Sequence, residues 1–553
     1  MTTPLLMLCH PAYGVPERAE PIDGEGGERV YFTSENGEAF HVDRIRGRWG
    51  EPTFATMPAD SEPAPFTSEP PAPTPTPRRA SNPGDKAAKR LLNLFDSKQG
   101  QIIRDPAGKR YAVVNTGRHW ETLDADGLRG YFASASAARG DLPGDSAIRE
   151  AVFAALSREA RPEHVYLRVG STDAGRRLVL DLADEARRVV EIDSEGWRVR
   201  DRSPVLFRRP GSLRPLPDPV DGGNLDELSD LFGLEGEAKI LALSWLLGTL
   251  APAGPFPMLV FLGPQGSGKT TAARALKRLI DDTAAPLRAL PRDERELAVS
   301  AQHSYLIGLD NLSGISGPIS DALCRLAGGD GFATRKLYSD DAETVLEAAR
   351  PVIATTIGEL ALARADLADR ALVIQLEPRR RFVPDDELEA AFATARPRLL
   401  GALLTAASVA LRNLGTTSRN GLPRMASFAR WVLAAESAMP WAAGDFMATY
   451  AGNRETVAIS GVEGDALAQA VLELVAIDGG RLETTAGELL SRLETRESLR
   501  RSSDLPKNPR ALGDRLRRLV PGLRAVGYVA TIRREGHDRE RRWVIRRATG
   551  ADE

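Results

Sequence analysis

A glycine-rich segment in the middle of the chain constrains the fold more than any other part of the sequence. It reads GPQGSGKT from Gly263 to Thr270 and matches the pattern GxxxxGK[ST]. An apolar run at 258–262 precedes it and a helical pattern at 270–280 follows it, which is the context that this motif needs. The backbone N–H groups of such a turn wrap phosphates, while its lysine meets the β and γ phosphates and its hydroxyl ligates Mg²⁺. The alternative is a glycine-rich turn that matches by chance. The segment predicts a P-loop for ATP and Mg²⁺, with contacts from Gly263, Pro264, Gln265, Gly266, Ser267, Gly268, Lys269, Thr270 and Thr271.

Strand and helix patterns alternate after this segment. Apolar runs at 304–309, 352–356 and 371–376 are typical of buried strands. Strands that alternate with helices predict a parallel sheet, so the expected class is α/β. Residues 385–450 have helical patterns throughout, which indicates a helical lid behind the P-loop core.

The first 220 residues have a different organisation. Asn36 and Gly37 stand between two alternating segments, the pattern of a tight β-hairpin. Ten prolines fall between Pro52 and Pro83, which indicates an extended linker. Helical periodicity and strand-like runs then indicate an α+β domain of unknown role. The predicted domains are a small β element (1–50), the linker (51–85), the α+β domain (86–218), the P-loop core (219–382), the lid (383–460) and a basic domain (461–553).

A second acidic ligand for Mg²⁺ is expected at the end of a strand next to the P-loop. Asp310 ends the run YLIGLD, 41 residues after Lys269, and is the candidate carboxylate; a helix-capping aspartate is the alternative. Asn311 follows it, and an amide could only orient the attacking water because it cannot accept a proton as a base. Thr355, with Thr356, ends the run VIATT and could sense the γ-phosphate.

Two further groups of cations are candidates for function. Residues 328–338, GGDGFATRKLY, bring Arg335 and Lys336 beside an aromatic ring, which suits a loop that grips single-stranded DNA. A solvated surface turn is the alternative. Arg370 follows a helical stretch and could serve as an arginine finger for a neighbouring subunit. A pair with Asp366 within the helix would leave Arg370 a purely structural role.

The order of these motifs resembles a known family. GPQGSGKT, LIGLDN, GGDGFATRKLY, RPVIATT and LADR look like motifs A, B, B′ and C of superfamily III helicases in the AAA+ class. The stretch is also similar to ATP-binding proteins of prophages and integrative elements, which often occur beside or fused to primase-polymerase domains. The resemblance covers about residues 224–450, and the C-terminal part more loosely.

Several roles follow from the resemblance alone. It implies an AAA+ core that holds nucleotide and Mg²⁺ through the P-loop and Asp310, with Thr355 at the sensor position and Arg370 as the finger. It also implies that Arg335 and Lys336 hold the DNA strand. Asn311 replaces a common acidic residue and Thr355 replaces a common asparagine, which puts the rate of turnover in doubt more than binding.

The C-terminal end is strongly basic although the whole chain has a net charge of −3. Residues 500–547 hold 15 Arg or Lys and 5 Asp or Glu, a net charge of +10. Helical patterns at 486–493 and 508–519 and a strand pair around Gly536 resemble a winged helix that binds duplex DNA. A charged module that docks a protein is the alternative. The predicted DNA contacts are Arg510, Arg515, Arg517 and Arg518 on the second helix, and Arg533 and Arg534, with Arg539 and Arg541, on the wing.

Composition limits the remaining possibilities. Apolar residues make up 42% and charged residues 27%, which is ordinary for a folded chain and excludes a disulfide scaffold or a disordered protein. Cys9 and Cys324 lie far apart, no run is long enough to cross a membrane, and the first residues lack a secretion signal. We therefore expect a cytoplasmic protein without a membrane partner.

These observations favour an ATP-dependent DNA helicase or translocase that replicates a phage or mobile element. Such an enzyme would work as a homo-oligomeric, hexameric ring on single- and double-stranded DNA, with a primase or initiator protein as a possible partner. The alternative is an AAA+ regulatory or anti-phage defence switch that binds DNA or an effector without unwinding. A small-molecule P-loop kinase explains neither the lid nor the basic end.

Overall fold

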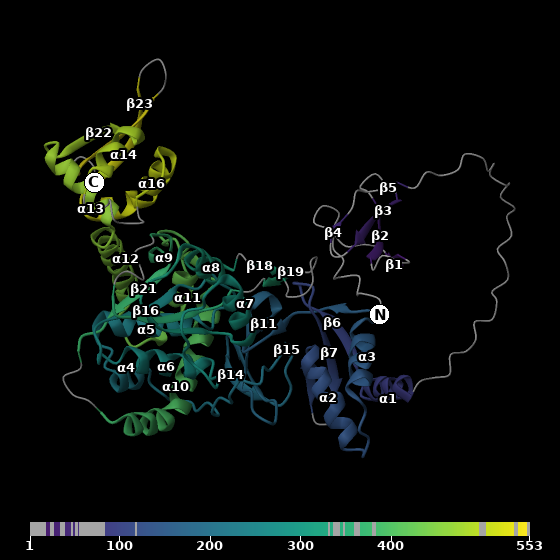
Figure 1. Ribbon diagram of the computed structural model, residues 1–553. Helices are drawn as coiled ribbons and strands as arrows, with labels where there is room; N and C mark the ends of the chain where they lie inside the picture. Colours follow the sequence, from purple (N-terminus) through teal and green to yellow (C-terminus); the bar gives the residue numbers. More distant parts are fainter. Residues whose placement is uncertain are drawn as a thin grey trace. The chain divides into compact units, whose positions relative to one another are not determined.

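The computed structural model divides the chain into two compact units, 1–79 and 80–553, which are described separately (Figure 1). The described residues are 18–22, 27–33, 39–45, 48–49, 53–54, 83–116, 119–329, 332–335, 343–346, 349–358, 365–378, 383–496, 505–535 and 540–549.

The first unit holds an antiparallel sheet. The order is β1-β2-β3-β4, and β5 also pairs with β3. Val30 lies opposite Val42 in the β2 and β3 pair, as the hairpin pattern predicts, while the expected turn at Asn36 and Gly37 and most of the proline-rich stretch lie outside the described residues. The strands are β1 Arg18–Ile22, β2 Gly27–Thr33, β3 Ala39–Ile45, β4 Arg48–Trp49 and β5 Thr53–Phe54.

The second unit begins with a small sheet and three helices. The strand order is β8-β7-β6-β9, and Figure 1 shows α2 and α3 beside β7. Phe95 and Phe132 pack in the apolar cluster that joins the three helices to β6 and β7. The elements are α1 Pro83–Ser97, β6 Gln101–Arg104, β7 Arg110–Asn115, β8 Trp120–Leu123, α2 Ala125–Ala137, α3 Asp145–Leu156 and β9 Arg161–Pro162.

A second small sheet follows, and its strands run antiparallel in the order β11-β12-β13-β14. β10 pairs with β15 in parallel beside it. The elements are β10 Val165–Tyr166, β11 Val169–Thr172, η2 Asp173–Gly175, β12 Arg177–Asp181, β13 Val189–Asp193, β14 Gly196–Arg200 and β15 Leu206–Phe207.

A parallel four-stranded sheet forms the centre of the second unit, as the alternating pattern predicts. The order is β17-β20-β16-β21, and a parallel bridge from Arg288 to Leu309 adds a further segment beside β17. Leu259 and Phe261 face one apolar cluster while Met258 and Val260 face the other, so both faces are covered. The strands are β16 Met258–Leu262, β17 Ile307–Leu312, β20 Val352–Thr356 and β21 Ala371–Gln375.

Helices pack on the two faces of this sheet. The cluster on one face contains α5, α6, α10 and α11, and that on the other contains α7 and α8. The helices are α4 Asp226–Phe232, α5 Gly236–Gly248, α6 Lys269–Ile280, α7 Glu294–His303, α8 Gly317–Gly328, α9 Ala365–Ala368, α10 Asp385–Asn413, α11 Ala426–Ala435, η4 Glu436–Ala438 and α12 Asp445–Glu463. None of the helices in the described ranges is both long and apolar enough to span a membrane.

One apolar cluster crosses the predicted boundary at residue 218. It runs from Leu167 to Tyr450 and combines side chains of the second small sheet with those of the parallel sheet and its helices. A buried charge group lies in the same region. Asp281 follows α6 and accepts from Lys277 at 2.9 Å and from the backbone N–H of Leu306 at 2.9 Å, and Arg168 lies 3.5 Å away.

These buried charges stabilise one another. Burial opposes the charge of Asp281, but Lys277, Arg168 and the N–H of Leu306 together hold the pKa of its carboxyl below its usual value. Arg168 also donates to the carbonyl oxygens of Asp181 and Arg214, so the guanidinium ties the second small sheet to the end of α6.

The C-terminal part has its own apolar core, which includes Leu489, Leu516 and Trp543. Its sheet has the order β22-β24-β23, with antiparallel pairs, and Figure 1 shows β23 and β22 with α14 and α16. The expected helices and strand pair are present, and α13 and β22 are additions. The elements are α13 Ala466–Ile477, β22 Arg481–Thr485, α14 Ala486–Glu494, α16 Pro509–Ala525, β23 Tyr528–Glu535 and β24 Glu540–Arg547.

Candidate functional site

The segment Gly263 to Gly268 forms the turn between β16 and α6, at the carboxyl end of a central parallel strand. This is the edge where open α/β sheets bind ligands. Lys269 begins α6 and its ammonium donates to the carbonyl oxygens of Gly263 at 2.7 Å and Pro264 at 2.6 Å. The side chain is 8% exposed, and burial lowers the pKa of Lys269 while Asp310 opposes that shift. The turn therefore holds a cation over its own backbone.

Two glycines are required by the geometry of this turn. A side chain at Gly263 would place its Cβ 2.3 Å from the carbonyl oxygen of Leu376, which follows the neighbouring strand β21. Gly268 has a φ of +87°, in the left-handed region that favours glycine. Ser267 closes the turn with a hydrogen bond from its hydroxyl to Pro264 at 3.0 Å. Pro264, Gln265 and Gly266 are exposed, and Thr271 lies half-buried in the first turn of α6.

The structure brings the predicted carboxylate next to the predicted P-loop hydroxyl. Thr270 Oγ1 donates to Asp310 Oδ1 at 3.0 Å, and Thr355 Oγ1 donates to the same oxygen at 2.5 Å. The backbone N–H of Asp310 donates to Arg288 at 2.8 Å, which fixes the strand end. Residues that are up to 85 positions apart in the sequence therefore meet at one edge of the sheet.

Thr355 also holds the backbone of Asn311. The N–H of Asn311 donates to Thr355 Oγ1 at 2.8 Å, and Asn311 has a φ of +54°. The pairing of β17 with β20 shifts in register between Leu309 and Leu312, so β17 continues past the predicted end of its apolar run through an irregular step. The single hydroxyl proton of Thr355 is given to Asp310, and the Asn311 side chain is exposed at the sheet edge.

Arg370 lies at the opposite edge of the same sheet. Its carbonyl accepts from the N–H of Met258 at 2.9 Å, where β16 and β21 begin, whereas the P-loop follows the end of β16. Five residues of strand, about 17 Å, therefore separate Arg370 from the P-loop of its own chain. The Asp366 side chain, the alternative partner, lies outside the described residues.

Asp369, next to Arg370, is held by two arginines that the sequence patterns did not single out. Arg454 donates to it at 2.6 Å, and Arg424 pairs with its other oxygen. Burial opposes the charge of Asp369, yet these two guanidinium groups hold the pKa of its carboxyl below the usual value. Arg424 lies in the connection between α10 and α11 and Arg454 in α12, both more than 50 residues later, so no local spacing reveals them.

Arg335 occupies a strand rather than the predicted loop. β18 Phe332–Arg335 pairs antiparallel with β19 Glu343–Leu346, and Arg335 lies opposite Glu343. The four residues FATR at 332–335 can form a strand because the residues ETVL at 343–346 supply the pairing partner. The Arg335 side chain, Lys336 and Tyr338 lie outside the described residues.

The predicted DNA contacts of the basic end fall into two groups. Arg515 is half-buried and donates to Asp465 at 2.8 Å, and Arg517 pairs with Asp514. The remaining predicted side chains that the structure describes are exposed, and Arg539 lies outside the described residues. On the strand pair, Arg533 lies opposite Arg542 and Arg534 opposite Arg541, and facing like charges cost stability, which Glu488 at 3.5 Å from Arg542 offsets in part. The exposed predicted contacts are Arg510 and Arg518 on α16 and Arg533 and Arg534 on β23.

Two family models match the chain. Residues 225–451 match the model described as the actinomycete integrative conjugative element replication protein. Residues 467–553 match the model of the C-terminal domain of this replication protein, which is called RepA. The two stretches together make up more than half of the chain. No curated protein matches the sequence.

Two solved structures are similar over most of the chain. One is the SCCmec type IV Cch, described as an active helicase, with 14% identity, a TM-score of 0.47, and coverage of 81% of this chain and 92% of that chain. The other is the C-terminal region of NrS-1, with 12% identity, a TM-score of 0.36, and coverage of 82% and 98%.

Proposed function

We propose that this chain, which belongs to the family of actinomycete integrative conjugative element replication proteins, is an ATP-dependent DNA helicase or translocase of the superfamily III type within AAA+. The observation that carries this proposal is the cluster at the carboxyl edge of the parallel sheet. There the P-loop lysine, its neighbouring hydroxyl and a strand-end carboxylate meet.

ATP would bind by replacing the oxygen atoms to which the Lys269 ammonium donates. Lys269 now donates to two carbonyl oxygens of the turn, and the β and γ phosphates of ATP would take their place. The exposed backbone from Pro264 to Gly266 would supply N–H donors to the same phosphates. Thr271 would extend these contacts along the first turn of α6.

The oxygen groups of Thr270 and Asp310 fit Mg²⁺. Their hydrogen bond of 3.0 Å places one hydroxyl and one carboxylate side by side, and hard oxygen ligands of this kind suit the ion. Mg²⁺ is commonly held by one or two carboxylates together with substrate phosphates, and Asp310 would supply the carboxylate here. Bound Mg²⁺ would neutralise charge on the transferred phosphoryl group.

The remaining residues divide the chemistry between two subunits. Thr355 orients Asp310 and the backbone of Asn311, and it would have to release Asp310 before it could sense the γ-phosphate. Asn311 would orient the attacking water. Arg370 lies at the opposite edge of the sheet from its own P-loop, which supports a role as a finger for the neighbouring subunit in a hexameric ring.

DNA would be held by two parts of the chain. Arg335 and Lys336 would grip single strand at the centre of the ring. The order helix, strand, helix, helix, strand, strand from α13 to β24 supports a winged helix for duplex DNA, in which Arg510, Arg518, Arg533 and Arg534 reach phosphates. A primase or initiator protein would be a further partner.

Stimulation of ATP turnover by single-stranded DNA tests this function. We expect the wild-type chain to hydrolyse ATP faster with single-stranded DNA and to displace a strand from a forked duplex. The double variant Arg335→Ala with Lys336→Ala should keep basal turnover and lose the stimulation, because the strand contact is removed. Turnover is measured with and without DNA, with Lys86→Ala plus Arg90→Ala as the control for loss of two exposed cations.

Two outcomes would contradict the helicase proposal. A wild-type chain whose ATP turnover ignores every DNA form and displaces no strand would instead be a regulatory ATPase. Full stimulation in the double variant would remove Arg335 and Lys336 from the mechanism.

A second test concerns the basic strand pair. Arg533→Gln with Arg534→Gln should weaken duplex binding and lower the slope of log K against log salt by about 1.8, since about 0.9 is expected for each lost phosphate contact. The matched control is Arg496→Gln, in the same domain, whose side chain is held by Glu473 at 3.2 Å. Fluorescence anisotropy across a salt series measures both. An unchanged slope would mean that the basic end docks a protein instead.

A further inference from the structure

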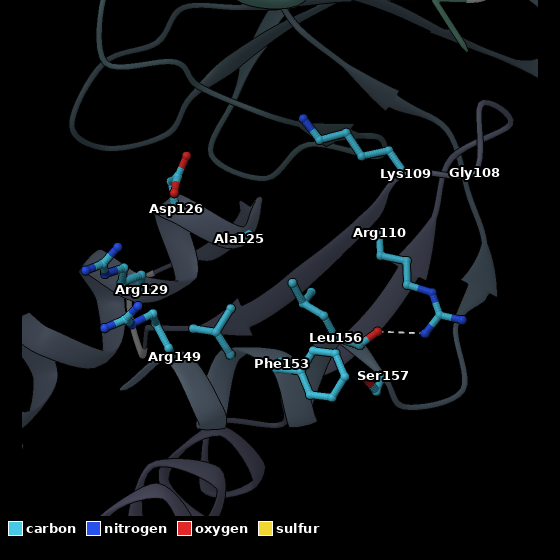
Figure 2. A pocket seen from close by; sticks show the side chains of 11 residues that line it. Gly108, Lys109, Arg110, Ala125, Asp126, Arg129, Arg149, Phe153, Leu156 and Ser157 are labelled. Carbon is cyan, nitrogen blue, oxygen red and sulfur yellow. Dashed lines mark hydrogen bonds between the residues drawn. The ribbon is translucent and has the colours of Figure 1, made fainter. Parts of the chain in front are cut away.

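An open hollow on the first part of the second unit has no role in the proposed function. It lies between the turn before β7, the start of α2 and the outer face of α3, and its volume is about 890 Å³. In Figure 2, Arg129 and Arg149 stand on one flank, Lys109 and Arg110 on the other, and Phe153 with Leu156 between them. Four cations and a single acidic side chain, Asp126, line this hollow.

The cations are held in place but remain accessible. Arg129 and Arg149 share the carboxylate of Asp145, with Arg149 at 2.7 Å, so one positive charge of the pair is not neutralised by it. Their side chains are 48% and 67% exposed. Arg110 donates to the carbonyl oxygens of Leu156 at 2.6 Å and Arg158 at 2.9 Å, which anchors it at the end of α3. Lys109 lies 3.9 Å from Asp124, so the four cations outnumber Asp145, Asp124 and Asp126 by one positive charge, which suits an anion.

Phe153 gives the hollow an apolar surface. Its side chain is 76% exposed, whereas Val152 beside it in the sequence is buried and Leu156, one turn along α3, is half-buried. A single exposed apolar side chain is normal on a protein surface. An exposed ring between two flanks of arginine and lysine is the combination that binds single-stranded nucleic acid, because a base stacks on the ring while cations meet the phosphates.

We propose that this hollow binds a segment of single-stranded DNA, with an unpaired base on Phe153 and phosphates on Arg129, Arg149, Lys109 and Arg110. Bases in a duplex are stacked on their neighbours and do not offer a free face to Phe153, so the site selects an unpaired strand. The proposal goes beyond the proposed function, which gives residues 86–218 no role, and it does not require ATP turnover.

Photochemical cross-linking tests the base contact directly. An oligo(dT) that carries 5-iododeoxyuridine is irradiated with the full chain, and the linked peptides are identified by mass spectrometry. We expect a link to Phe153 in the tryptic peptide 150–158, and we expect Phe153→Ala to lose it. Links confined to other peptides would overturn the proposal.

Affinity measurements test the energetic contribution. They use the full chain with Arg335→Ala and Lys336→Ala, so that the other proposed single-strand contact is absent. Phe153→Ala should weaken oligo(dT) binding by at least about fivefold, the lower limit for one stacked base. Arg129→Gln with Arg149→Gln should lower the salt slope by about 1.4, since single strands give about 0.7 for each phosphate contact.

The control is an arginine outside the hollow. Arg90→Gln removes an arginine that is 72% exposed and lies 3.9 Å from Asp141, outside the hollow, and should leave affinity and slope unchanged. Unchanged affinity in both test variants would overturn the proposal. Displacement of oligo(dT) by dTMP at equal concentration would identify a mononucleotide site instead, and displacement by an acidic peptide alone would identify a protein site. If the wild-type chain hydrolyses no ATP but still forms the cross-link to Phe153, the proposed function would be rejected and this inference would stand.

Discussion

Lys269→Ala is expected to abolish ATP turnover and to weaken nucleotide binding sharply. The ammonium is the cation that the turn holds, at 2.7 Å from Gly263 and 2.6 Å from Pro264, and the substitution removes the charge that would meet the β and γ phosphates. Turnover is measured by phosphate release at saturating ATP, and binding by anisotropy of a fluorescent ATP analogue.

The control for this variant lies on the same helix. Arg274→Ala removes an exposed cation one turn further along α6 and should leave phosphate release close to wild type. Thermal unfolding of both variants checks that Lys269→Ala is folded, because the two carbonyl oxygens lose their donor. A folded Lys269→Ala chain with wild-type turnover would show that the glycine-rich turn is not a P-loop.

Arg370→Ala is expected to lower turnover by about 10³-fold while nucleotide binding stays near normal. The reason is the position of Arg370 at the amino edge of the sheet, about 17 Å of strand from the P-loop of its own chain. A finger in that position can act only on the site of a neighbouring subunit. Turnover per chain should therefore rise with protein concentration in the wild type and stay flat in the variant.

A neighbouring arginine supplies the matched control. Arg424→Ala removes a cation from the same edge, and Asp369 keeps its contact with Arg454 at 2.6 Å. We expect turnover near wild type in this variant. Equal turnover in Arg370→Ala and wild type would mean that Arg370 only forms ion pairs. An equal loss of turnover in Arg370→Ala and Arg424→Ala would mean that both arginines stabilise this edge of the sheet and that Arg370 is not a finger.

The parts of the fold that were predictable from the sequence are those with a local signal. β16, β20 and α6 begin and end within a residue of the expected positions, because each has an apolar period bounded by glycine, proline or polar residues. The four-residue strands β6, β8 and β18 were harder, because so few residues carry little information and β18 becomes a strand through its partner β19.

The candidate site shows the same division. The positions of Lys269, Thr270 and Asp310 follow from motif and strand ends. The hydroxyl of Thr355 instead donates to Asp310, a contact across two strands that no spacing specifies. The partner of Arg515 was equally hidden, since Asp465 lies 50 residues earlier and caps another helix. The separation of four between Lys277 and Asp281 is a helical spacing that could have revealed their buried pair.

The apolar cluster from Leu167 to Tyr450 determines where the chain can be cut. A fragment that starts at residue 219 would keep the P-loop but lose Arg168, so Asp281 would face a newly opened surface with Lys277 as its remaining buried cation. It would also uncover the side of the core that β11 to β13 close. A truncated ATPase fragment should therefore begin before Leu167. If a shorter fragment precipitates, the cause would be its exposed apolar core and not a lack of enzyme activity.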